Sequence, residues 1–172
     1  MNDAWDESLK AYVLRILPLL CSVILVMLSY MPFNILLPTS IHPAMGVICV
    51  YYWMLHRPDV FNLFSVFCLG LVEDLISAAP LGSNLFQLLV LYVLISNLLK
   101  YFNGKPFEVM WVGFLPAAFL SMFARWVVVS VYYGQFLPLG MLGFSVLITV
   151  AAYPIISLVN VWVQNKFMAD EV

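Results

Sequence analysis

RPDVFNLFSVFCLGLVEDLISAAPLG, residues 57–82, is the stretch that decides the fold. It opens with Arg57-Pro58, continues as an apolar run over residues 60–79 and closes with a Pro-Leu-Gly turn. A run of about 20 residues is what a helix needs to cross the hydrocarbon core of a bilayer. Two adjacent acids, Glu73 and Asp74, lie inside this run, where each costs about 2.5–3.5 kcal/mol on insertion scales. We therefore expect these two carboxyl groups to have partners elsewhere in the chain.

The composition around this stretch is that of an integral membrane protein. The chain has 172 residues, of which 65% are hydrophobic and 9% are charged, whereas a soluble domain carries about 25% charged residues. We predict an all-α membrane protein with one domain, residues 1–172. No block of Lys and Arg indicates binding to nucleic acid.

Six apolar runs predict six transmembrane helices joined by short loops. Pro32 predicts a kink in the first helix, Pro43 fits the first turn of the second, and Arg57 before Pro58 should end that helix. Asp59 is the predicted N-cap of the third. The predicted spans are residues 16–37, 43–55, 60–79, 84–99, 107–132 and 139–163.

The basic residues predict the orientation of these helices. Residues 38–42, 77–83 and 133–138 form three predicted loops without Lys or Arg. Because cytoplasmic loops are enriched in Lys and Arg, we expect both termini to be cytoplasmic. Six of the seven basic residues flank the cytoplasmic side of this arrangement: Lys10, Arg15, Arg57, Lys100, Lys105 and Lys166. The seventh, Arg125, lies inside the fifth span.

Arg125 is the predicted partner of Asp74. Asp74 lies about 21 Å along the third span and Arg125 about 27 Å along the fifth, so both fall in the outer half of the bilayer. Each residue shares a helix face with small residues, which allow close approach of membrane helices. Glu73 is rotated by about 100° from Asp74 and faces elsewhere. Three interpretations remain open: a structural ion pair, a binding or proton-handling site, and an Arg125 side chain that reaches the outer surface alone.

Motifs for catalysis are absent from the sequence. There is no zinc-protease motif, no P-loop and no Gly-x-Ser-x-Gly elbow. The three cysteines stand singly in apolar runs without the spacing of a metal or redox motif. We therefore expect no enzymatic activity, no cofactor and no metal.

The segment from residue 43 to residue 92 resembles the MreD family of bacterial rod shape-determining membrane proteins. The string Gly-Leu-x-x-Asp-Leu-x-Ser-x-x-Pro-Leu-Gly at residues 70–82 is the most specific part of the likeness, which covers about 50 residues of the chain. The residues that carry the resemblance are Pro43, Trp53, Arg57, Pro58, Gly70, Asp74, Pro80, Leu81, Gly82 and Tyr92.

The resemblance implies a fold, a role and partners. The fold would be the six-helix arrangement that the substrate-binding subunits of energy-coupling-factor transporters also use. The role would be that of a non-enzymatic scaffold subunit of the cell-elongation (rod) complex, or elongasome, which controls cell shape and peptidoglycan synthesis. The direct partner would be MreC, and the indirect ones MreB, RodA and the rod-system transpeptidase.

A second function follows from the same fold. The chain would then be the substrate-binding subunit of a small-molecule transporter, with an outward-facing pocket. Candidate lining residues are Glu73, Asn84, Gln87 and Arg125, all near the predicted outer face.

Overall fold

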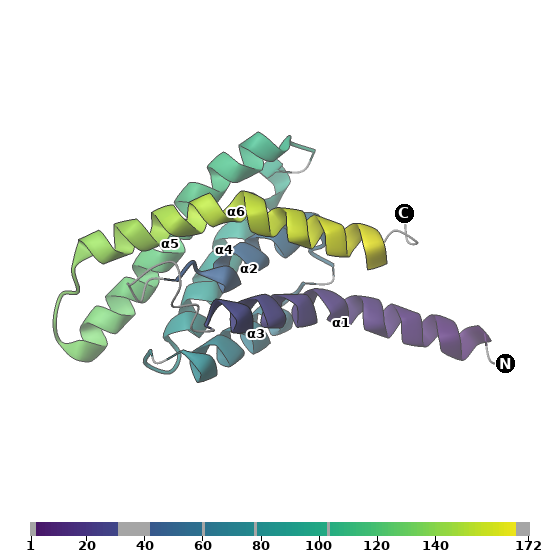
Figure 1. The fold of residues 1–172 in the computed structure, drawn as a ribbon, viewed down its shortest axis with the longest axis horizontal. Coiled ribbons are helices and arrows are strands. Elements are labelled where there is room, and N and C mark those ends of the chain that lie inside the picture. Colours follow the sequence, from purple (N-terminus) through teal and green to yellow (C-terminus); the bar gives the residue numbers. More distant parts are fainter. Residues whose placement is uncertain (1–2, 31–41, 60, 78, 103, 168–172) are drawn as a thin grey trace.

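The computed structural model describes residues 3–30, 42–59, 61–77, 79–102 and 104–167, and Figure 1 shows their arrangement. Within these ranges the chain forms six helices and no strand, which confirms the all-α fold class. The helices are α1 (Asp3–Ser29), α2 (Met45–His56), α3 (Leu63–Ile76), α4 (Ser83–Phe102), α5 (Phe107–Tyr133) and α6 (Leu139–Phe167).

The short helix α2 is the centre of the core. Every residue from Gly46 to Met54 is buried, and α2 packs against α1, α3, α4 and α6. A helix that is apolar on all sides is stable only when other elements surround it. The length of α2 therefore fits a central helix that its neighbours enclose.

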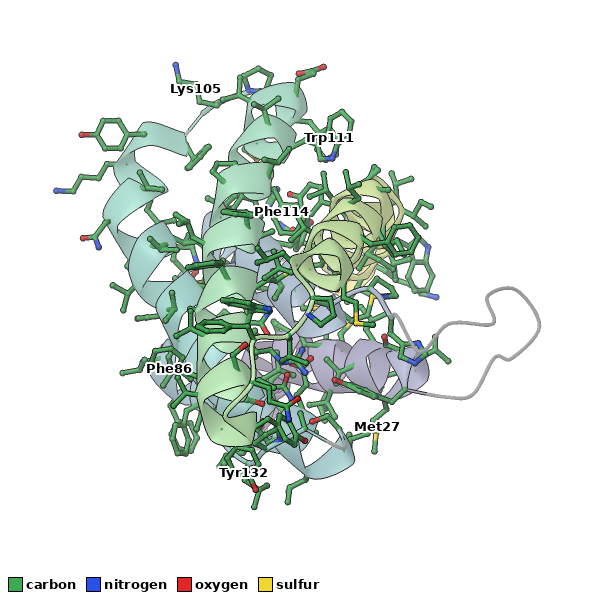
Figure 2. All side chains as sticks on the ribbon, turned by 90° about the vertical axis from the view of Figure 1, so that its left-hand side faces the viewer. Met27, Phe86, Lys105, Trp111, Phe114 and Tyr132 are labelled. Carbon is green, nitrogen blue, oxygen red and sulfur yellow. The ribbon has the colours of Figure 1, made fainter. Side chains whose placement is uncertain are left out.

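Aromatic side chains join α2 to α5 and α6. The Tyr51 hydroxyl donates a hydrogen bond to the carbonyl oxygen of Met110 on α5 at 2.8 Å. The Tyr51 ring also meets Phe114 edge-on, with the ring centroids 4.9 Å apart. Phe114 in turn stacks on Tyr153 of α6 at 4.6 Å, on the side of α5 that faces α6 (Figure 2). These contacts fix one end of α5 and the middle of α6 against the central helix.

Three helices, α4, α5 and α6, are long and apolar enough to cross a membrane. Their outward side chains are apolar as well: Val112 of α5 is 68% exposed, and Leu147 and Leu158 of α6 are 67% and 69% exposed. Large exposed apolar surfaces of this kind fit a lipid environment rather than water. Two further apolar helical segments, Ile16–Ser29 and Met45–His56, are shorter.

The predicted third span, residues 60–79, is too long. Helix α3 begins at Leu63 and ends at Ile76, and Ser77 is already extended. Its N-cap is Asn62, whose side chain accepts the Ser65 N–H at 3.1 Å. The assignment of Asp59 as the cap was wrong, because Asp59 forms an ion pair with Arg57 at 3.5 Å instead.

The predicted boundaries of the first two helices agree with the structure only in part. Helix α2 ends at His56 with Arg57 as its C-cap, as the following proline predicts. Pro43 does not lie in the first turn of α2, which begins at Met45; its carbonyl accepts the Ser29 hydroxyl at 3.2 Å. Helix α1 starts at Asp3 rather than at residue 16. The kink expected at Pro32 falls outside the described residues.

The start of α1 and the end of α6 lie at the same end of the molecule (Figure 1). The turn between α5 and α6 lies at the opposite end. Helices α1 and α6 approach each other where the Cys21 sulfur contacts Oδ1 of Asn160 at 3.8 Å.

Candidate functional site

The carboxylate of Asp74 binds the N-terminus of the next helix. Its Oδ2 atom accepts the backbone N–H groups of Gly82 at 2.9 Å and Leu85 at 3.2 Å. Its Oδ1 atom accepts the Asn84 N–H at 2.9 Å. The first N–H groups of a helix have no partner within the helix, and the helix dipole favours a negative charge there. Asp74, which is 2% exposed, thus caps α4 from α3.

The turn between α3 and α4 is built around this cap. Gly82 has φ +91°, a conformation that L side chains adopt with strain, and it lies in the Pro-Leu-Gly turn that ends the stretch at residues 57–82. The Pro80 carbonyl accepts the Ser83 N–H at 3.1 Å. The Ser77 hydroxyl accepts a hydrogen bond from Nδ2 of Asn84 at 2.7 Å. The chain therefore reverses within a few residues and brings the amides of α4 to Asp74.

Gly70 allows α3 and α4 to pack closely. A Cβ atom at this position would lie 2.8 Å from the Cα of Leu85. Backbone cannot move away from such a contact as the tip of a flexible side chain can. The glycine of the Gly-Leu-x-x-Asp string thus sets the separation of the two helices, and its aspartate sets where α4 begins.

The predicted ion pair between Asp74 and Arg125 was wrong. In the described part of the chain no salt bridge joins these two side chains, and both Asp74 oxygens are occupied by backbone N–H groups. The reason is that a helix N-terminus supplies the partial positive charge that the sequence analysis sought in a side chain. The prediction matched side chains only and left the backbone of the following helix out of account.

Glu73 contacts Tyr30 and lies within electrostatic range of Arg125, although no salt bridge joins Glu73 and Arg125 in the described part of the chain. Its carboxylate is 6% exposed and accepts a hydrogen bond from the Tyr30 hydroxyl at 3.4 Å. Arg125 interacts electrostatically with both Glu73 and Tyr30. The two neighbouring acids therefore point to different parts of the molecule, as their rotation of about 100° along the helix predicts.

Gly46 of α2 makes room for the Glu73 carboxylate. A Cβ atom at position 46 would overlap with Oε2 of Glu73. Neither Gly46 nor Tyr30 was among the residues predicted for the site. A glycine inside an otherwise apolar run is the signal that would have identified Gly46, because it marks a place where another group approaches the helix. Tyr30 had no such signal.

The first two turns of α4 carry buried polar atoms without a hydrogen-bond partner. They are the Ser83 hydroxyl, Oδ1 of Asn84 and Nε2 of Gln87, on side chains that are 1–2% exposed. A buried polar group without a partner costs about 1–3 kcal/mol. Asn84 and Gln87 were among the predicted lining residues, and they lie on the helix that Asp74 caps.

The other residues that carry the resemblance in residues 43–92 lie apart from the polar residues around Asp74 and Glu73. Trp53 is fully buried in α2, and its indole N–H has no partner. Arg57 and Pro58 form the turn between α2 and α3, and Tyr92 is half-buried on α4. Leu81, at the tip of the α3–α4 turn, is 79% exposed. These residues serve the helix ends and the core, and they do not converge on one centre.

The cluster holds no set of metal ligands. No group of three or more neighbouring His, Cys, Asp or Glu side chains occurs among the described residues. What this arrangement of carboxylates, backbone amides and one guanidinium does is fix three helices, α3, α4 and α5, and the end of α1 relative to one another.

Comparison with known proteins gives a distant relative. An uncharacterized protein of Rickettsia prowazekii (strain Madrid E) is 26% identical over 158 residues, which is 92% of this chain and 90% of the relative. No family model matches the chain, and no solved structure matches it. The similarity extends over nearly the full length of both proteins, so the relative has about the same size.

Proposed function

We propose that this chain is a non-enzymatic scaffold subunit of the bacterial cell-elongation (rod) complex, similar to MreD, and that it binds MreC. In this role it takes part in the control of cell shape and peptidoglycan synthesis. MreB, RodA and the rod-system transpeptidase are then indirect partners. The proposal rests on the string at residues 70–82 and on what the side chains of that string do in the fold.

The observation that carries the proposal is the structural use of Asp74. Its two oxygens accept three backbone N–H groups, so this carboxylate serves to hold the start of α4. Gly70 and Gly82 set the helix separation and the turn. The most specific part of the sequence is therefore architectural. When the most distinctive residues of a membrane protein maintain its fold, the part that remains for function is its outer surface, which can bind a partner protein.

The proposed topology is six spans with both termini in the cytoplasm of a bacterial inner membrane. Support comes from the three membrane-length helices and from the six basic residues that lie on one side of the predicted arrangement. The central helix α2 and the short α3 then cross with their ends below the lipid surface, which the enclosure of α2 by other helices permits.

The test is affinity purification of the full chain from its own bacterium with mild detergent. We expect MreC, a single-span protein with a periplasmic body, to be retained, and depletion of the chain to turn rod-shaped cells round. Asp74→Asn should weaken the retention of MreC because it loosens the start of α4, and Asp59→Asn is its matched control, since the Asp59 side chain is 64% exposed. Failure to retain MreC together with unchanged cell shape would overturn the proposal.

A second candidate function is that of a substrate-binding subunit of a small-molecule transporter. The unpaired atoms of Asn84 and Gln87 favour it, since they lie on the same end of the bundle as Glu73 and Arg125. The same purification distinguishes the two functions, because a transport subunit would bring down an ATPase module instead of MreC. Gln87→Leu would then abolish uptake, whereas a scaffold would tolerate it.

A further inference from the structure

A cavity of about 280 Å³ lies at the end of α5 where the chain turns toward α6. It is at the opposite end of α5 from Lys105, close to Tyr132 (Figure 2). The residues that line it are Trp126, Val127, Ser130, Val131, Gly134, Gln135 and Phe136. It is thus separate from the polar cluster around Asp74, and it has no part in the proposed scaffold function.

The cavity is held open by the way α5 ends. Gly134 takes the left-handed conformation with φ +64°, and the Gln135 N–H donates to the Ser130 carbonyl at 3.2 Å. This pattern is a Schellman motif, which directs the chain back along the helix that it ends. The Trp126 indole N–H then donates to the Leu137 carbonyl at 3.2 Å. The cavity lies between the last turns of α5 and this returning segment.

One lining residue carries a buried polar atom. Ser130 is 6% exposed, and its hydroxyl has no hydrogen-bond partner among the described residues. Gln135, the other polar residue of the lining, is exposed. The sequence carries no charged residue between Arg125 and Lys166. An occupant should therefore be uncharged and mainly apolar, with one acceptor for the Ser130 hydroxyl.

The surroundings match the interface region of a bilayer. Tyr132, Tyr133 and Phe136 are 69%, 55% and 91% exposed, and exposed aromatic residues gather where acyl chains meet headgroups. The ester carbonyls of phospholipids lie at that depth. The volume is nearly twice that of an engineered cavity of about 150 Å³ that binds benzene, so a bent length of hydrocarbon chain fits.

We propose that this cavity binds one acyl chain of a membrane phospholipid, whose ester carbonyl accepts a hydrogen bond from the Ser130 hydroxyl. The absence of a cation in the lining leaves the phosphate outside the site. Lipids with different headgroups should therefore bind alike. A partner protein would instead bring a helix with many contacts, and the short returning segment offers too little surface for that.

Fluorescence quenching by brominated phospholipids tests the proposal, with Trp126 as the reporter in the cavity wall. The full chain is reconstituted with Trp126 as its single tryptophan, and a second protein keeps Trp162 alone, which is 58% exposed on α6. We expect phospholipids brominated near the ester end to quench Trp126 at least as strongly as Trp162, although Trp126 is the less exposed residue. Weaker quenching of Trp126 would show that no acyl chain enters and would overturn the proposal.

Two variants sharpen this test. Ser130→Leu fills the cavity and removes the hydroxyl, so the extra quenching of Trp126 should be lost. Leu147→Phe, a similar increase in size on an exposed position of α6, should leave it unchanged. Circular dichroism checks that both variants are folded. Unchanged quenching in Ser130→Leu, or a change of oligomeric state that accompanies it, would overturn the proposal, the latter in favour of contact between two copies of the chain.

Discussion

The two hairpins α3–α4 and α5–α6 both turn at a glycine with positive φ, but different hydrogen bonds stabilise the two turns. Each has a glycine with positive φ at the turn, Gly82 at +91° and Gly134 at +64°. In the first hairpin a buried carboxylate holds the three N–H groups at the start of α4. In the second, backbone hydrogen bonds and the Trp126 indole hold the end of α5.

The difference shows where this chain needs a charge and where it does not. A helix N-terminus inside the bundle leaves N–H groups that neither lipid nor apolar side chains can satisfy. Asp74 meets that need, and Gly70 lets the hairpin close tightly around it. The end of α5 satisfies its carbonyls by folding back on itself, and the looser turn leaves a cavity. The first hairpin is rigid by construction, and the second leaves space for an occupant.

The largest expected effect concerns the side of the membrane on which the two turns lie. Leu81 and Phe136, at the tips of the turns, are 79% and 91% exposed. In a chain without its native cysteines, we expect Leu81→Cys and Phe136→Cys to react with an impermeant maleimide from the periplasmic side. Lys105→Cys should react only after the cells are opened. If Leu81→Cys and Phe136→Cys behave oppositely, the six-span topology is wrong.

The next largest effect should come from the charge that holds the first hairpin. Asp74→Ala leaves three N–H groups at the buried start of α4 without an acceptor, which should cost about 3–5 kcal/mol. We expect a much reduced yield of folded protein and a large shift in an SDS unfolding titration. Asp74→Asn keeps one acceptor oxygen, so it should fall between the wild-type protein and the alanine variant. Equal stability of all three would mean that water satisfies these N–H groups equally well.

The sequence predicted the fold better than it predicted the contacts of the candidate site. Six apolar runs with Pro and Gly between them predicted the six helices, because apolar periodicity and helix-breaking residues act locally. The ends of α4, α5 and α6 were predicted to within four residues. Helix α3 was predicted too long, because its apolar flanks resemble its interior and the side-chain cap was assigned to Asp59 instead of Asn62.

The contacts of Glu73 and Asp74 could not be predicted from the sequence near these two residues. Depth and helix faces placed Asp74, Glu73 and Arg125 in the same region, and the structure does bring Arg125 near Glu73. Which acid turns to Arg125 depends on where the backbone of α4 begins, and that follows from the turn at Gly82. Side-chain pairing gives no information on it. The Pro-Leu-Gly turn itself was recognised from the sequence, since Pro and Gly mark turns locally.

A double-mutant cycle on Glu73 and Arg125 should give an effect of intermediate size. Because these side chains interact electrostatically, the two single substitutions Glu73→Gln and Arg125→Gln should not be additive, with a coupling of about 0.5–3 kcal/mol. The same cycle with Asp74→Asn in place of Glu73→Gln should be close to additive, since the first hairpin holds Asp74 by backbone N–H groups. Thermal unfolding in detergent measures all the variants. Stronger coupling of Arg125 to Asp74 than to Glu73 would reverse the assignment.

The smallest effect should come from the glycine of the second hairpin. A Cβ atom at Gly134 or at Gly82 meets nothing within 4 Å, so alanine at either position adds only backbone strain. At Gly134 this strain should cost about 1 kcal/mol, because left-handed backbone disfavours a side chain. Gly82→Ala should cost more, because its φ of +91° lies further from the left-handed minimum and its N–H binds Asp74. In Asp74→Ala the part of the extra cost that comes from the bond to Asp74 should disappear, so the cost of Gly82→Ala should move toward that of Gly134→Ala. An equal cost at both positions in the presence of Asp74 would mean that the carboxylate does not depend on the geometry of the turn.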